Sequence, residues 1–152
     1  MRYAKIKKMD IANGNGIRVS LFVQGCNFHC MGCFNKETWS FSGGKEWNKE
    51  IEDKFIELCQ KPHIQGVSIL GGEPLQQDDD LLHLLQRIKT EVKKPVSLWT
   101  GYKFEDIPED KKSLLEYIDE IIDGQFIEDL KDLNLDFRGS SNQKRYKKGT
   151  DW

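Results

Sequence analysis

The sequence lacks both a strong net charge and any long run of apolar residues. Its 152 residues carry 23 Lys and Arg against 25 Asp and Glu, a net charge of −2, whereas proteins that bind nucleic acid or membranes are usually strongly basic. No apolar stretch approaches the roughly 18 residues of a membrane helix. Lysines interrupt the N-terminal segment MRYAKIKKMD, which therefore holds no signal-peptide core. We expect a cytoplasmic protein that binds neither nucleic acid nor membrane.

Short apolar runs alternate with helical repeats along the chain. Runs at 19–23, in GVSILGGEP, in PVSLWTGY and near Ile121 predict strands, while WNKEIEDKFIELCQK, DDDLLHLLQRIKTEV and SLLEYIDEIIDG predict helices. Strands separated by helices form βαβ units with a parallel sheet. We predict one α/β domain over residues 1–152 with about five or six mostly parallel strands, too short for the roughly 250 residues of a closed barrel. Residues 138–152 are polar and predict a C-terminal loop or tail.

Four distinctive segments follow the four predicted strands. They are the cysteine loop CNFHCMGC, then GGEP, TGY and DG. In parallel sheets, ligands collect at the carboxyl ends of the strands. The sequence therefore predicts one functional site at this edge of the sheet.

Cysteine is scarce, with four residues, and three of them fall within the eight residues of the cysteine loop. In a cytosolic protein, clustered thiols more often bind metal or do chemistry than form disulfides. Zinc would require Cys26, Cys30, Cys33 and the adjacent His29 to turn onto one small ion. A 4Fe–4S cluster is normally held by four thiolates, so three would leave one iron free to bind a substrate or cofactor. Cys59 lies on the apolar face of a predicted helix, where we expect a small buried hydrophobe.

Several stretches run in order from Asp10 to Gln143: DIANGNGIRVSLFVQGC, the C-x-x-x-C-x-G-C loop with FNKETW after it, SILGGEP, LWTGY, IIDGQF and RGSSNQ. This ordered set resembles the radical S-adenosylmethionine superfamily. Within it, the set is most similar to the family of activating enzymes of anaerobic ribonucleoside-triphosphate reductase. The resemblance implies a partial, open (β/α) barrel of the radical-SAM type.

The resemblance also implies the roles of individual residues. The metal ligands would be Cys26, Cys30 and Cys33, which would hold a 4Fe–4S cluster whose open iron binds S-adenosylmethionine. The residues implied to bind that cofactor are Gly32, Cys33, Phe34, Gly71, Gly72, Glu73, Thr100 and Asp123. Glu73 would accept a hydrogen bond from the methionyl ammonium group, and Phe28 or Phe34 would stack on the adenine. No side chain is expected to act as a catalytic acid or base, because the radical forms on the cofactor.

The implied activity is that of an oxidoreductase that generates a glycyl radical. Reductive cleavage of S-adenosylmethionine at the cluster would give a 5′-deoxyadenosyl radical, which removes hydrogen from a glycine of the reductase. The implied partners are the large subunit of anaerobic ribonucleoside-triphosphate reductase and a flavodoxin-like or other low-potential electron donor. The basic residues near the C-terminus, such as Lys144 and Lys148, would help to dock the reductase or would simply be solvated.

Two other functions remain open at this stage. A small radical enzyme of the same superfamily can act on a small molecule, such as a deazapurine-like compound. A non-catalytic iron–sulfur carrier or zinc-stabilised binding module would also explain three clustered cysteines. The WTGY and RGSSNQ segments favour the reductase-activating family.

Overall fold

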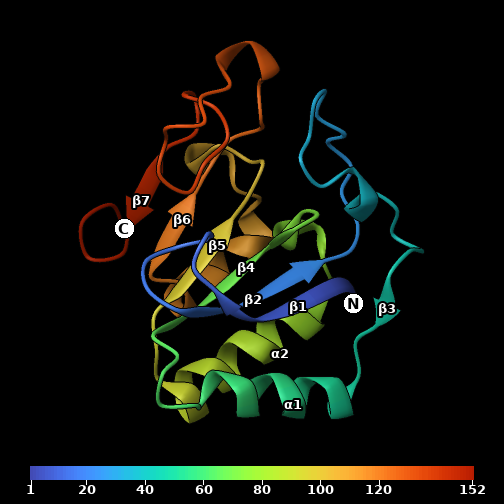
Figure 1. Ribbon diagram of the computed structural model, residues 1–152, viewed down its shortest axis with the longest axis vertical. Helices are drawn as coiled ribbons and strands as arrows, with labels where there is room; N and C mark the ends of the chain where they lie inside the picture. Colours follow the sequence, from blue (N-terminus) through green and yellow to red (C-terminus); the bar gives the residue numbers. More distant parts are fainter.

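The computed structural model describes all 152 residues and contains one sheet of seven strands (Figure 1). Their order across the sheet is β3-β1-β2-β4-β5-β6-β7. The strands are β1 (Arg2–Asp10), β2 (Arg18–Val23), β3 (Lys45–Glu46), β4 (Gly66–Gly71), β5 (Val96–Trp99), β6 (Glu120–Ile122) and β7 (Arg145–Lys147).

The middle of the sheet is parallel and its edges are antiparallel. Strands β2, β4, β5 and β6 pair in parallel, whereas β1, β3 and β7 join by antiparallel pairing. The predicted α/β fold with a parallel, open sheet is therefore confirmed at its centre. The predicted count of five or six strands is too low, because β1, β3 and β7 were not recognised. The segment predicted to be a polar loop or tail contributes β7, which pairs with β6 through its backbone.

Two helices lie side by side along one face of the sheet (Figure 1). They are α1 (Lys49–Cys59) and α2 (Asp79–Arg87), and α2 continues as one π-helical turn, η3 (Ile88–Val92). Each begins at a side-chain cap, because Asn48 accepts a hydrogen bond from the N–H of Ile51 and Asp78 accepts one from the N–H of Asp80. The 3₁₀ helices are η1 (Lys36–Thr38), η2 (Pro74–Gln76), η4 (Phe104–Asp106), η5 (Glu109–Tyr117) and η6 (Glu128–Leu130). No helix in the structure has the length and apolar character needed to cross a membrane.

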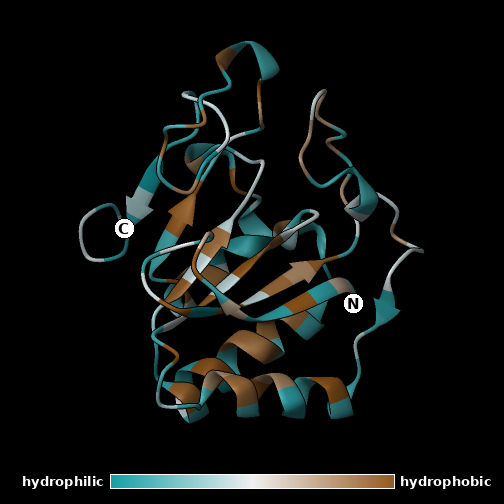
Figure 2. Ribbon diagram, in the orientation of Figure 1, coloured by the Kyte–Doolittle hydropathy of each residue, from teal (hydrophilic) through white to brown (hydrophobic).

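Alternate residues of the parallel strands face opposite sides of the sheet. One set belongs to the core that α1 and α2 cover, and Figure 2 shows apolar residues along the central strands and on part of each helix. From the strands this set comprises Val19, Leu21, Val23, Val67, Ile69, Val96, Leu98 and Ile121. Burying side chains of this kind is the main stabilising contribution to such a fold. The other set, with the strand period of two, faces the concave side of the open sheet.

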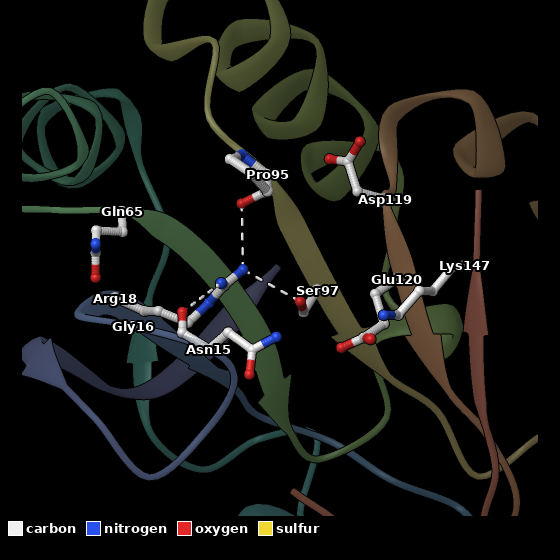
Figure 3. Close-up of a pocket in the computed structure, with 9 residues that line it drawn as sticks. All are labelled: Asn15, Gly16, Arg18, Gln65, Pro95, Ser97, Asp119, Glu120 and Lys147. Carbon is white, nitrogen blue, oxygen red and sulfur yellow. Dashed lines mark hydrogen bonds between the residues drawn. The ribbon is translucent and has the colours of Figure 1, made fainter. Parts of the chain in front are cut away.

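Arg18 fills the amino-terminal end of this concave face (Figure 3). Its side chain is 4% exposed, and its guanidinium donates hydrogen bonds to the hydroxyls of Ser68 (2.8 Å) and Ser97 (3.1 Å). It also donates to the carbonyls of Asn15, Val67 and Pro95. Arg18 thus ties β2 to β4 and β5 from below and leaves the carboxyl ends of these strands free for the site.

Candidate functional site

A cavity of about 630 Å³ lies at the carboxyl ends of β2, β4, β5 and β6. The segments after all four strands contribute to its wall, as the sequence predicts. Its lining residues include Cys26, Cys30, Cys33, Gly71, Gly72, Glu73, Thr100, Gly101, Gly124 and Gln125. In Figure 1, the cysteine loop and the segment after β6 rise from the same end of the sheet, opposite α1.

Backbone hydrogen bonds hold the cysteine loop at both ends. The N–H groups of Gly25 and Cys26 donate to the carbonyls of Thr38 (2.7 Å) and Trp39 (3.0 Å). Further along, the N–H of Cys33 donates to the carbonyl of Cys30 at 3.1 Å. The loop therefore closes on itself and presents its three thiols to one cavity.

The thiols of Cys26, Cys30 and Cys33 are free and partly exposed. Burial raises the pKa of the Cys26 thiol and of the Cys30 thiol. Thiolates are the usual ligands of iron–sulfur clusters, and three of them on one loop at the mouth of a cavity fit a 4Fe–4S cluster with one open iron. Metal binding would favour the deprotonated thiols that burial alone disfavours.

His29 and Cys59, the other possible metal ligands, do not join the three thiols. His29 stacks on Trp39, with ring centroids 4.5 Å apart and an interplanar angle of 9°. No group of three or more His, Cys, Asp or Glu side chains converges closely enough to hold a single ion. Cys59 is fully buried in the core, where burial raises its pKa to about 12. The prediction that Cys59 is a small buried hydrophobe is confirmed.

Gly71 and Gly72 are glycines because neighbouring backbone approaches them. A Cβ atom at Gly71 would lie 2.7 Å from the Cα of Phe22, and its φ of +103° disfavours other residues. A Cβ at Gly72 would lie 2.5 Å from the carbonyl oxygen of Gly25. Both glycines thus allow the end of β4 to pack against the chain that enters the cysteine loop, and their backbone lines the cavity.

Glu73 lines the cavity and is almost completely enclosed, with an exposed fraction of 1%. Its carboxylate accepts hydrogen bonds from the N–H of Leu75 (2.9 Å), the hydroxyl of Thr100 (2.8 Å) and the N–H of Gly101 (2.6 Å). Burial raises the pKa of Glu73 to about 7, although these three hydrogen bonds favour the ionised form. The predicted residues Glu73 and Thr100 are therefore in direct contact.

Asp123 lies beside the cavity in an adjoining one, shared with Phe28, Tyr102 and Gly124. Its carboxylate accepts hydrogen bonds from the N–H of Phe104 and the N–H of Lys144, both at 2.9 Å. Asp123 therefore joins the segments after β5 and β6 and does not line the same cavity as the thiols.

The two rings considered for the adenine lie on the cysteine loop and directly after it. Phe28 packs edge-on against Tyr102 (5.0 Å), and Phe34 packs against Phe126 (4.9 Å) while 55% exposed. Gly32 has a φ of +75°, and a Cβ there would lie 2.9 Å from the Cδ of Glu128. Both rings line the cavity, so both remain in reach of a ligand there.

Other cavity residues escaped the sequence prediction. Lys5 and Lys7 enter the cavity from β1, and Lys5 lies 4.7 Å from the ring centroid of Phe22. Arg138 lines the cavity with its Nε buried and without a hydrogen-bond partner. Gln125 contacts the sulfur of Cys30. The resemblance to the family includes the segment IIDGQF, but no local sequence pattern singles out Gln125 within it.

The fold and the three-thiol cavity define a protein of the iron–sulfur class. In agreement, a family model described as "4Fe-4S single cluster domain" matches residues 12–146. Proteins named anaerobic ribonucleoside-triphosphate reductase-activating protein match almost the whole chain. The protein of Salmonella typhimurium is 44% identical over 94% of this chain and 96% of its own length. That of Escherichia coli is 42% identical over the same shares, and that of Enterobacteria phage T4 is 39% identical over 95% of this chain and 92% of its own.

The chain belongs to the family of anaerobic ribonucleoside-triphosphate reductase-activating proteins. The family resemblance drawn from the sequence is thereby confirmed. At the level of the family, the predicted activating enzyme, its 4Fe–4S cluster and its use of S-adenosylmethionine are confirmed as well. The individual cluster and cofactor ligands stay predictions.

Proposed function

We propose that this chain activates anaerobic ribonucleoside-triphosphate reductase by generating a glycyl radical on it. Cys26, Cys30 and Cys33 would hold the 4Fe–4S cluster and would leave one iron without a protein ligand, available to S-adenosylmethionine. The observation that carries this proposal is the meeting of three free thiols with the Gly71–Glu73 backbone at one cavity. When bound, the cluster and S-adenosylmethionine supply the one-electron chemistry that leads to the radical.

The methionyl end of S-adenosylmethionine binds along the segment after β4. Glu73 accepts three hydrogen bonds from the protein, and a carboxylate has about four acceptor positions, so one remains for an N–H of the methionyl amino group. Thr100 fixes the carboxylate from the other side. A hydrogen bond from this N–H would favour the ionised form of Glu73 and partly offset its burial.

The adenosyl end lies against the cysteine loop. The backbone of Gly32, Cys33 and Phe34 would contact the adenine, and the exposed ring of Phe34 would be its stacking surface. Cys33 and Phe34 line the cavity, whereas Gly32 does not. Arg138 offers a guanidinium whose Nε has no partner in the protein, which suits a carboxylate in the cavity. Asp123 supports the ribose side through the segments it joins.

The fold is a partial barrel of the radical-SAM type, open on one side. Strands β3 and β7 end the sheet and do not pair with each other. Exposed apolar side chains stand on the loops that reach this end of the sheet, namely Met31, Phe34, Ile127, Leu130 and Leu133. They provide a surface along which an extended, glycine-bearing segment of the reductase reaches the cavity. The electron comes from a flavodoxin-like or other low-potential donor in the cytoplasm.

An anaerobic mixture of cluster-loaded chain, reductant, S-adenosylmethionine and reductase tests the proposal. Electron paramagnetic resonance should show a glycyl doublet on the reductase, and each of Cys26→Ala, Cys30→Ala and Cys33→Ala should abolish it. Cleavage of S-adenosylmethionine with turnover of a small molecule, and without a radical on the reductase, would contradict the proposal. One zinc per chain and no cleavage would contradict it as well.

A further inference from the structure

Gln125 contacts one of the three cysteines of the cavity from outside the cysteine loop. The Cys30 thiol donates a hydrogen bond to the Oε1 atom of Gln125, with 3.7 Å between sulfur and oxygen. The two residues are 95 positions apart in the sequence. Both line the cavity, and Gln125 is otherwise exposed. Its side chain has no other hydrogen-bond partner in the structure, so no competing contact prevents the amide from hydrogen-bonding to the sulfur.

The RGSSNQ segment fixes the backbone on both sides of Gln125. The Asn142 side-chain amide donates to the carbonyl of Gln125 at 2.8 Å, and that of Gln143 donates to the carbonyl of Gly124 at 2.9 Å. The Ser140 hydroxyl accepts a hydrogen bond from the N–H of Ile127 at 3.2 Å. Through these three contacts, the RGSSNQ segment positions Gln125 against the cysteine loop.

Neighbouring contacts keep the two loops together. Phe126 packs on Phe34, and the ammonium of Lys131 lies 5.3 Å from the centroid of the same ring. A Cβ at Gly139 would lie 2.7 Å from the Phe34 ring, so this glycine admits the close approach. The contact of Gln125 with Cys30 is therefore one of several along this interface.

We infer that Gln125 donates a hydrogen bond to the sulfur of Cys30 in the cluster-loaded protein and raises the reduction potential of the cluster. A thiolate bound to iron has no proton and can only accept. Rotation of the Gln125 amide about its Cγ–Cδ bond would turn Nε2–H toward the sulfur in place of Oε1, so that the side chain becomes the donor. Hydrogen bonds to ligand sulfurs stabilise the added negative charge of the reduced cluster and are one determinant of its potential. The inference rests on the proposed function, because it requires Cys30 to be a cluster ligand.

Asn142 is a positioning residue for this contact. It does not line the thiol cavity, and it acts through the carbonyl of Gln125 alone. Its replacement should weaken the hydrogen bond to Cys30 without adding or removing any group at the cluster. The effects of Gln125 and Asn142 should accordingly be non-additive.

A redox titration of the cluster-loaded chain, followed by electron paramagnetic resonance without S-adenosylmethionine, tests the inference. Gln125→Leu should shift the midpoint potential to a more negative value. Asn142→Ala should shift it in the same direction by less, and the double variant should match Gln125→Leu. Gln76→Leu is the matched control, because Gln76 holds the same loop through the N–H of Asn27 and touches no cysteine. It should leave the potential unchanged.

A second measurement uses the unaltered protein and does not depend on whether a variant loads its cluster. Protein labelled with nitrogen-15 in its glutamine side chains should show a nitrogen coupling to the reduced cluster. The coupling should persist in Gln76→Leu. Absence of the coupling, or an unshifted potential in Gln125→Leu with its cluster intact, would overturn the inference and leave the proposed function standing. A full cluster in Cys30→Ala would instead overturn the ligand assignment on which both rest.

Discussion

The hydroxyl of Thr100 donates a hydrogen bond to the carboxylate of Glu73 at 2.8 Å, and this contact joins the segment after β5 to the segment after β4. The N–H of Gly101 donates to the same carboxylate from the same side. The carboxylate is thus fixed in the wall of the cavity before any ligand arrives. Such pre-ordering reduces the entropy that binding must otherwise overcome.

Glu73 should make the stability of the cluster-free chain depend on pH. Burial raises the pKa of Glu73 in the fold to about 7, above its ordinary value of 4.5. The contribution of Glu73 to stability is therefore full below the unfolded pKa and is lost as the pH rises through the folded pKa. The free energy of unfolding should fall with pH in this window, by at most about 1.4 kcal/mol per unit. Urea denaturation at a series of pH values under reducing, anaerobic conditions measures this slope.

The variant Glu73→Gln provides the control for this slope. It loses an acceptor and should be less stable overall, but its stability should not fall over the same window. Asp10 and Asp78, whose pKa values are lowered in the fold, lose their contributions only at more acidic pH. An unchanged slope in Glu73→Gln would show that another group titrates.

Gly71→Ala and Gly149→Ala form a matched pair. Both glycines have positive φ, +103° and +87°, but a Cβ at Gly71 meets backbone at 2.7 Å, whereas nothing lies within 4 Å of one at Gly149. Alanine at 149 should cost about 1 kcal/mol through backbone strain. Alanine at 71 should cost about 3 kcal/mol or more, because the end of β2 must also move. Equal midpoints in urea for the two variants would be incompatible with this packing.

Arg18→Met should destabilise the fold and leave the cluster in place. The substitution removes the donors on which Ser68, Ser97 and the carbonyl of Pro95 depend, and it should cost about 2–4 kcal/mol. Lys49→Met, at an exposed ion pair with Asp53, should cost less. Urea denaturation gives the stabilities, and iron analysis gives the cluster content. Loss of iron in Arg18→Met at full folding would contradict a purely structural role.

The four cysteines should separate into two groups. Cys26→Ala, Cys30→Ala and Cys33→Ala should each lose the cluster, whereas Cys59→Ala should retain about four irons per chain and lose about 1 to 2 kcal/mol of stability. Iron and sulfide analysis of anaerobically prepared protein distinguishes them. The reverse outcome, in which Cys59→Ala lost the iron and Cys33→Ala kept it, would refute the assignment.

The sequence predicts the parts of the fold whose side chains follow a period. The helices α1 and α2 and the strands β2, β4, β5 and β6 are of this kind, and they bring the four segments to one edge. The sequence does not predict strand β1, because this strand carries Lys5, Lys7 and Lys8 and lacks an apolar alternation. Strand β7 forms through backbone hydrogen bonds to β6. Such pairing does not require alternating apolar side chains, so the sequence Arg-Tyr-Lys does not indicate a strand.

The candidate site shows the same division. The cysteine loop and GGEP are local motifs, and the sequence locates them directly. The burial of Arg18 contradicts the usual exposure of arginine and depends on carbonyls from three separate segments. The contact of Gln125 with Cys30 depends on the RGSSNQ segment folding back across the chain. Contacts of this kind arise only from the tertiary fold.

The most direct test concerns the open iron at the three-cysteine cluster. S-adenosylmethionine labelled with nitrogen-15 at its amino group is added to the reduced, cluster-loaded chain, and electron–nuclear double resonance is recorded. A nitrogen coupling to the cluster is expected, because the amino group would bind the iron that no cysteine holds. A cluster with four protein ligands and no coupling to the labelled cofactor would contradict the proposed chemistry.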